Sequence, residues 1–288
     1  MERIVRQLHP GGRLLRAWRL TGGVSAEIHG LEIALPDGST LRRVLRCHGE
    51  GDRAVNPDVA ADEARLLALM AGAGLPVPGV HLLDRSGEIL PTPYLVIDFL
   101  PGDWQAAPAD LEARTRPPAE ALALVHGFAG DDARLAFLAR RDPAGRAELA
   151  RERALPEDRA LEARLRAALA GWEPVPPGEA RVLLHGDFWP GNLLWSEGRL
   201  SAVLDWEDAG LGHPLLDLAH ARLELLWAWG EAAAGAFTRH YAARRPFDPA
   251  RLPCYDLWAA LRAMLRYGDW GLVPEELAAK RRGLRGFV

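Results

Sequence analysis

The hydrophobic pattern of the sequence changes once, near the Pro101-Gly102 pair, and this change limits the folds open to the chain. Before the pair, short apolar runs separated by turn residues predict strands over residues 14–20, 24–31, 41–46, 80–83 and 94–100. After it, apolar residues recur at three- and four-residue intervals, which predicts helices over residues 119–128, 133–139 and 157–170. We therefore expect an α+β fold with an N-terminal antiparallel sheet and a larger, mostly helical C-terminal part.

The same change of pattern predicts two lobes, residues 1–101 and residues 102–288. With 288 residues, of which 49% are apolar, the chain can bury a core in each lobe. In the first lobe we expect one main helix on the sheet, with Asn56 as its N-cap and an end near Gly74. The C-terminal helices are expected to break at Pro246, Pro253 and Pro274.

Composition narrows the classes of partner. The formal net charge of −4 gives no basic field that would attract a nucleic-acid backbone, so a small-molecule partner fits better. Cys47 and Cys254 lack metal-ligand spacing, and the sequence shows neither a signal-peptide pattern nor a long apolar span. We expect a cytoplasmic protein without a membrane or nucleic-acid partner. Lys280 is the only lysine in the chain.

A polar segment between two apolar runs carries the candidate chemistry. It reads His185-Gly186-Asp187-Phe188-Trp189-Pro190-Gly191-Asn192, and Asp205 follows thirteen residues later. Phosphoryl transfer needs a carboxylate that orients or deprotonates the attacking hydroxyl, and oxygen ligands that hold magnesium on the phosphates. Asp187 suits the first role, and Asn192 and Asp205 suit the second. The step from Asp187 to Asn192 is that of the protein-kinase catalytic loop, with Gly186 in place of the arginine.

These residues resemble the aminoglycoside phosphotransferase family of kinase-like enzymes, which has choline, homoserine, fructosamine and macrolide kinases as relatives. The resemblance extends over residues 20–218 and is most specific over residues 184–217. It implies a bilobal protein-kinase-like fold that binds a nucleotide, ATP or alternatively GTP, with Mg²⁺ between the lobes. It also implies that a hydroxyl of a small-molecule alcohol accepts the phosphoryl group.

The resemblance assigns a role to each polar residue of the segment. Asp187 would be the catalytic base, and Asn192 and Asp205 would be the magnesium ligands. His185 would hold the loop by hydrogen bonds, and Asp217 would tether it. Any one of these residues alone could equally cap backbone groups in a turn. The full combination favours an enzyme.

The expected phosphate clamp lies between the first two strands. Gly22 and Gly23, followed by Ser25, could let the backbone approach phosphate oxygens closely, or could form an ordinary hairpin turn. Backbone groups near Asp98 and Leu100, at the end of the first lobe, would contact the adenine.

The kinase pattern requires a lysine on the third strand, paired with a helix glutamate. Because no lysine is available there, Arg46 on strand 41–46 is the candidate substitute, and Glu63 on the following helix is its expected partner. Arginine occupies more room than lysine and cannot lose its charge, so the change affects nucleotide affinity or geometry. The alternatives are a solvated strand charge for Arg46 and an exposed helix acid for Glu63.

Three functions remain open from the sequence. The first is an ATP- and Mg²⁺-dependent kinase of a small-molecule hydroxyl, and the second is a pseudokinase or nucleotide-binding module without phosphotransfer, suggested by the missing lysine. A metal-dependent hydrolase using His185, Asp187 and Asp205 is disfavoured because no histidine-rich cluster accompanies them. Aromatic residues of the C-terminal helices could line an acceptor pocket or form core: Trp227, Trp229, Tyr241, Tyr255, Trp258, Tyr267 and Trp270.

Overall fold

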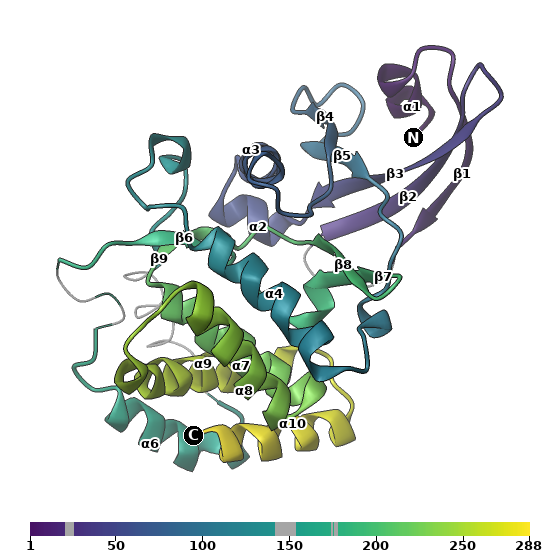
Figure 1. Cartoon of the computed structure of the whole chain (residues 1–288). Coiled ribbons are helices and arrows are strands. Elements are labelled where there is room, and N and C mark those ends of the chain that lie inside the picture. The colour runs from purple at the N-terminus through teal and green to yellow at the C-terminus, as the bar shows by residue number, and fades with distance from the viewer. Residues whose placement is uncertain (21–25, 142–153, 174, 176–177) are drawn as a thin grey trace. The chain divides into compact units, whose positions relative to one another are not determined.

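The computed structural model describes residues 1–20, 26–141, 154–173, 175 and 178–288, and the chain divides into two compact units (Figure 1). Unit 1 comprises Met1–Asp103 and Ser201–Glu207, and unit 2 comprises Trp104–Leu200 and Asp208–Val288. The segment 201–207 therefore belongs to unit 1, whereas a single division after residue 101 places it in the second lobe. This assignment decides which unit holds Asp205.

The sheet of unit 1 has five antiparallel strands in the order β1-β2-β3-β5-β4, as the sequence predicts for this part of the chain. Its strands are β1 (Arg13–Arg19), β2 (Ala26–Ala34), β3 (Thr40–His48), β4 (Val80–Asp84) and β5 (Tyr94–Asp98). The turn between β2 and β3 contains Gly38 with a φ of 84°, and Asp37 accepts hydrogen bonds from the backbone and side chain of Ser39. This turn fixes the register that places Arg46 opposite Ile28.

The core of unit 1 follows from alternation along the strands. Every second residue of the central strands points to one face, where helix α1 (Glu2–Leu8) adds two aliphatic side chains. The sequence analysis missed α1, because a helix of two turns has too few apolar positions to show a period. The buried members of this core are Ile4, Val5, Leu31, Ile33, Leu45, Tyr94 and Val96.

The helical part of unit 1 corrects the prediction of one main helix capped by Asn56. Two helices are present, α2 (Glu50–Val55) and α3 (Val59–Gly72), and Asn56 is the C-cap residue of α2. Its side chain accepts a hydrogen bond from the backbone N–H of Asp58 at 3.0 Å and so shapes the turn between the helices. The prediction missed α2 because that helix buries no residue and therefore carries no hydrophobic pattern.

The segment 201–207 is held in unit 1 by backbone and side-chain contacts. The N–H of Val203 donates to the carbonyl of Pro76 at 2.8 Å, and the Trp206 side chain is buried. The indole N–H of Trp206 lies 3.3 Å from the carbonyl oxygen of Val203. A buried tryptophan thus separates two carboxylates, Asp205 and Glu207, and fixes the backbone that carries both.

Unit 2 is built mainly of helices. Helix α8 packs against α4 and α7, and α9 packs against α7, so that α7 lies between neighbours (Figure 1). The helices are α4 (Leu111–Val125), α6 (Arg159–Ala168), α7 (Pro214–Trp229), α8 (Glu231–Arg244), α9 (Leu252–Arg266) and α10 (Pro274–Phe287). The short strands are β6 (Val182–Leu184), β7 (Leu193–Ser196), β8 (Arg199–Val203, ending in unit 1) and β9 (Gly210–Gly212), with the pairs β6-β9 and β7-β8.

Two predicted helix positions in unit 2 need correction, and two predicted breaks coincide with the starts of helices. The helix expected at residue 119 begins at Leu111, because Asp110 caps the N–H of Ala113 and the helix continues through Pro117 and Pro118. Residues 133–139 contain only one 3₁₀ turn, η2 (Ala133–Leu135). Pro253 and Pro274 lie in the first turns of α9 and α10, where a proline needs no hydrogen-bond donor.

Within the described residues, no helix combines the length and the apolar character that a membrane span requires. The sequence left open whether the aromatic residues of the C-terminal helices line an acceptor pocket or form core. Tyr241, Tyr255 and Tyr267 are each only 1% exposed and belong to the core.

Candidate active site

The loop that follows β6 is tied to α7 through its backbone. One carboxylate oxygen of Asp217 accepts the N–H of His185 at 2.6 Å, and the other accepts the N–H of Gly186 at 3.1 Å. His185 in turn receives the N–H of Asp187 on its Nδ1 at 3.3 Å. The tether by Asp217 and the architectural role of His185, both inferred from the family resemblance, are confirmed by these bonds.

A buried polar chain supports Asp217 from behind. Nε2 of His126 lies 3.3 Å from Asp217, and Nδ1 of His126 lies 2.7 Å from the hydroxyl of Tyr241. Burial alone would raise the pKa of Asp217, but the hydrogen bond and charge of His126 and the backbone of His185 lower it. Asp217 is therefore ionised and can accept both loop N–H groups.

Gly186 explains why this loop departs from the protein-kinase pattern. Its φ of 88° lies in the left-handed region, and an added Cβ would overlap the carbonyl oxygen of Asp208. An arginine, which the kinase motif has here, would require a different path for the chain around Asp208.

The carboxylate of Asp187 is held at both oxygens. Nδ2 of Asn192 donates to Oδ2 at 3.0 Å and to the backbone carbonyl of Asp187 at 2.9 Å, while Nε2 of His220 lies 3.2 Å from Oδ1. Burial would raise the pKa of Asp187, but the contact with His220 and its charge lower that pKa to about 2. The side chain is 37% exposed, so the ionised carboxylate remains accessible.

In unit 1, Arg46 lies among three carboxylates. Its Nε is 3.1 Å from Glu63 on α3, and its Nη2 is 2.5 Å from Asp205 and 2.6 Å from Glu207. His48, two residues along β3 on the same face, places Nε2 2.7 Å from Glu63. The predicted pairing of Arg46 with Glu63 is confirmed, and neither residue is solvated, since Arg46 is 5% exposed and Glu63 is 3% exposed.

Each charged group of this cluster favours the ionised form of its partner. Burial alone would lower the pKa of Arg46, but Glu63, Asp205 and Glu207 together raise it. Burial likewise would raise the pKa of Glu63, which Arg46 and His48 lower. Glu63 is thus shared between Arg46 and His48, and Asp205 and Glu207 both lie beside Nη2 of Arg46.

Asp205 has an unusual backbone conformation for a residue other than glycine. Its φ is 65°, in the left-handed region that aspartate tolerates better than most side chains. Such a conformation persists only where the surroundings hold it, and here the buried Trp206 and the contact with Arg46 do so.

The remaining predicted nucleotide-site residues fall into two groups. Gly22, Gly23 and Ser25 lie outside the described residues. Asp98 ends β5, and its carboxylate accepts the N–H of Gly79 at 2.9 Å and contacts His81 at 2.7 Å, while Leu100 follows in the connection to unit 2. The side chain of Asp98 thus stabilises the end of the sheet, which leaves the predicted backbone contacts with adenine as predictions.

Three residues of these clusters escaped the sequence analysis: His48, Glu207 and His220. Each had a local signal. His48 shares a strand face with Arg46, and Glu207 lies two residues after Asp205. His220 lies one helical turn after Asp217 and so faces the same loop.

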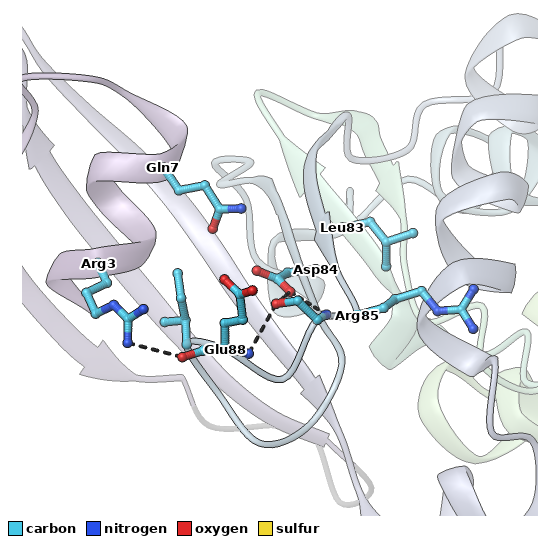
Figure 2. Close-up of a pocket in the computed structure, with 8 residues that line it drawn as sticks. Arg3, Gln7, Leu83, Asp84, Arg85 and Glu88 are labelled. Carbon is cyan, nitrogen blue, oxygen red and sulfur yellow. Dashed lines mark hydrogen bonds between the residues drawn. The ribbon is translucent and has the colours of Figure 1, made fainter.

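Unit 1 also contains a pocket away from these clusters. Figure 2 shows it between Arg3 and Gln7 of α1 and the end of β4. Its volume is about 400 Å³. Asp84 at its wall already accepts the hydroxyl of Tyr94 at 2.9 Å and the N–H of Ser86 at 2.8 Å. Its polar groups thus stabilise the fold, and no predicted site residue lines it.

Comparison with known proteins identifies the family. A model described as the phosphotransferase enzyme family matches residues 33–258. Homoserine kinase from Phenylobacterium zucineum is 30% identical over 218 residues, which cover 68% of this chain and 65% of the relative. Acyl-CoA dehydrogenase family member 10 from Mus musculus is 27% identical over 194 residues, which cover 62% of this chain but 18% of the relative. The chain thus spans less than a fifth of that protein's length.

Solved structures show the same fold. Aminoglycoside phosphotransferase APH(4)-Ia, in a ternary complex with AMP-PNP and hygromycin B, has a TM-score of 0.67 at 20% identity, with 99% of this chain and 96% of that chain covered. Macrolide 2'-phosphotransferase MphH from Brachybacterium faecium has a TM-score of 0.62 at 22% identity, with 93% and 91% covered. The predicted kinase-like α+β fold is confirmed.

Proposed function

Since the chain belongs to the phosphotransferase enzyme family, we propose that it transfers the terminal phosphoryl group of ATP to a hydroxyl of a small molecule, with magnesium as the metal ion. The observation that carries this proposal is the Asp187 carboxylate, which is ionised, accessible and held at both oxygens on a tethered loop. A group fixed in this way can orient an attacking hydroxyl.

Asp187 acts on the acceptor. The hydroxyl oxygen of the acceptor bonds to the terminal phosphorus, the bond from that phosphorus to the bridging oxygen breaks, and ADP leaves. The hydroxyl proton passes to a carboxylate oxygen of Asp187. Because the low pKa makes Asp187 a weak base, its main work is orientation, and it takes the proton late, as the loose transition state of phosphoryl transfer allows.

Asn192 and Asp205 would hold the magnesium ion. Nδ2 of Asn192 donates to Asp187, and this orientation leaves the amide oxygen, a hard ligand, for a cation. Asp205 supplies a carboxylate, also a hard ligand, on a side chain that is 25% exposed. When bound, magnesium would offset the negative charge of the phosphates.

The nucleotide contacts come from unit 1. We assign Arg46, oriented by Glu63, to the phosphates that a kinase lysine would contact, since its fork can engage two oxygens. Gly22, Gly23 and Ser25 are proposed as the phosphate clamp, and the backbone near Asp98 and Leu100 as the adenine contact. GTP is the alternative nucleotide.

The acceptor is to be found by screening. Purified protein with Mg·ATP is assayed for ADP release against homoserine, choline, hygromycin B, other amino sugars and macrolides, and the phosphorylated product is confirmed by mass spectrometry. Replacing a general base commonly costs about a hundredfold to ten-thousandfold in rate, so Asp187→Asn is expected to lose turnover while remaining folded. Unchanged turnover in this variant would remove Asp187 from the mechanism.

A nucleotide-binding module without transfer is the second candidate, and the arginine in place of the kinase lysine is the observation that favours it. It predicts thermal stabilisation by Mg·ATP with no phosphorylated product from any acceptor class. A product whose formation depends on Asp187 excludes it.

A further inference from the structure

Helix α7 contacts the catalytic loop twice. Asp217 binds the loop backbone, and His220, one turn further along, places Nε2 3.2 Å from Oδ1 of Asp187. The His220 side chain is 16% exposed, so the imidazole is largely buried beside the carboxylate. One helix face thus fixes both the path of the loop and the side chain that the proposed reaction uses.

A second charged pair lies further along α7, away from the loop. Glu224, the next residue on that face, is 7% exposed, and its Oε2 lies 3.5 Å from Nζ of Lys280 on α10. Lys280 is itself fixed, since its Nζ lies 3.7 Å from the ring centre of Trp227 and its carbonyl accepts the indole N–H of Trp227 at 2.9 Å. The only lysine of the chain is therefore paired with the Glu224 carboxylate.

The charges around His220 favour its imidazolium form. Burial alone would lower the pKa of His220, but Asp187 on the loop and Glu224 on α7 raise it, while Arg262 on α9 opposes them. The pKa of Glu224 is raised as well, because burial raises it more than His220 and Lys280 lower it.

We infer that His220 is a positioning residue for Asp187, an inference that rests on the proposed function. An imidazolium at Oδ1 and the Asn192 amide at Oδ2 fix the plane of the carboxylate. Each oxygen has two lone-pair sites, so the acceptor hydroxyl can still bond to it. The imidazolium also keeps the carboxylate ionised until the phosphoryl group has begun to move.

The kinetic test compares two histidines in similar settings. His240 on α8 has a side chain that is 15% exposed and Nε2 3.1 Å from Glu112, but it takes no part in the catalytic loop. His220→Ala is expected to lower kcat roughly tenfold to a hundredfold with little change in nucleotide affinity. His240→Ala is expected to leave kcat unchanged. His220→Gln, which keeps an N–H donor, should recover part of the loss.

The pH profile separates positioning from a merely structural contact. Since the pKa of His220 is raised above 6.5, kcat should fall as pH rises through that raised pKa. Glu224→Gln removes a supporting charge and should move this fall to lower pH, and His220→Gln should lack it. A fall at the same pH in the wild type and in His220→Gln overturns the inference.

A measurement without turnover keeps this test distinct from the proposed function. The ring signals of His220 are identified by NMR as those lost in His220→Gln, and their pH titration is recorded in the wild type, Glu224→Gln and Asp187→Asn. Lower titration midpoints in both variants support the inference even if no acceptor is found. Unchanged midpoints overturn it, as does full activity of His220→Ala in an enzyme that needs Asp187.

Discussion

In unit 2 the carboxylate of Asp187 meets an imidazole, whereas in unit 1 the carboxylates of Glu63, Asp205 and Glu207 meet a guanidinium. An imidazole gains and loses its proton near neutral pH, and a guanidinium does not. The two side chains also differ in exposure, since that of Asp187 is 37% exposed and that of Arg46 is 6% exposed. Unit 2 thus pairs an accessible carboxylate with a group that titrates, whereas unit 1 pairs its carboxylates with a fixed, buried charge.

The largest effect on stability is expected from removing the fixed charge. Arg46→Met leaves three carboxylates without their guanidinium, and loss of one partner from a buried cluster costs about 3–5 kcal/mol. Arg42→Met is the matched control, since Arg42 lies on the same strand, its side chain is 55% exposed, and it pairs with Glu32 at 3.1 Å. Such an exposed pair contributes roughly 0–1 kcal/mol. Urea unfolding of both variants checks the difference, and equal losses would contradict a special role for the cluster.

The path of the catalytic loop gives the next effect. Gly186→Ala forces a Cβ into the carbonyl oxygen of Asp208 at a φ of 88°, and we expect a loss of about 2–4 kcal/mol together with most of the activity. Gly87→Ala tests the φ effect alone, because Gly87 has a φ of 73° with nothing within 4 Å of an added Cβ. The expected cost there is roughly 1 kcal/mol. Similar losses in the two variants would mean that the close approach to Asp208 is unimportant.

The two clusters differ in how much of each could be predicted from the sequence. The pairing of Arg46 with Glu63 could be predicted because strand periodicity places Arg46 and the helix pattern places Glu63. The antiparallel sheet and the helical second part followed from the same periodicities. The sequence could therefore predict the features that depend on local periodicity.

Residues whose role depends on distant contacts could not be predicted in this way. The need for glycine at 186 arises from Asp208, which the fold brings beside it. His220 lies on the largely buried face of α7, where a histidine is usually a core residue, and only the structure shows that it meets Asp187. The membership of Asp205 and Glu207 in unit 1 likewise depends on the burial of Trp206 there.

A smaller effect is expected at the tether of the catalytic loop. Asp217→Asn keeps one acceptor oxygen for the N–H groups of His185 and Gly186 but turns an N–H₂ group toward the other, and an unsatisfied buried donor costs about 1–3 kcal/mol. Asp110→Asn is the control, because Asp110 caps the N–H of Ala113 and asparagine caps a helix as well as aspartate does. Denaturant midpoints of the two variants measure the difference. A neutral Asp217→Asn variant would show that the loop holds its path without this carboxylate.

The smallest effect is expected in the pH dependence of stability in unit 1. The stability that Glu63 contributes should not change near neutral pH. The pKa of Glu63 is lowered below 4.5, because Arg46 and His48 outweigh the burial that would raise it. A lowered folded-state pKa contributes stability that is present above the unfolded value and is lost as pH falls through the folded value, by about 1.4 kcal/mol for each unit of difference. The stability difference between the wild type and Glu63→Gln should therefore be constant from neutral pH down to about 4.5 and shrink only below it. A difference that already changes near neutral pH would make unit 1 as titratable as the Asp187 site, and the distinction between the two units would fail.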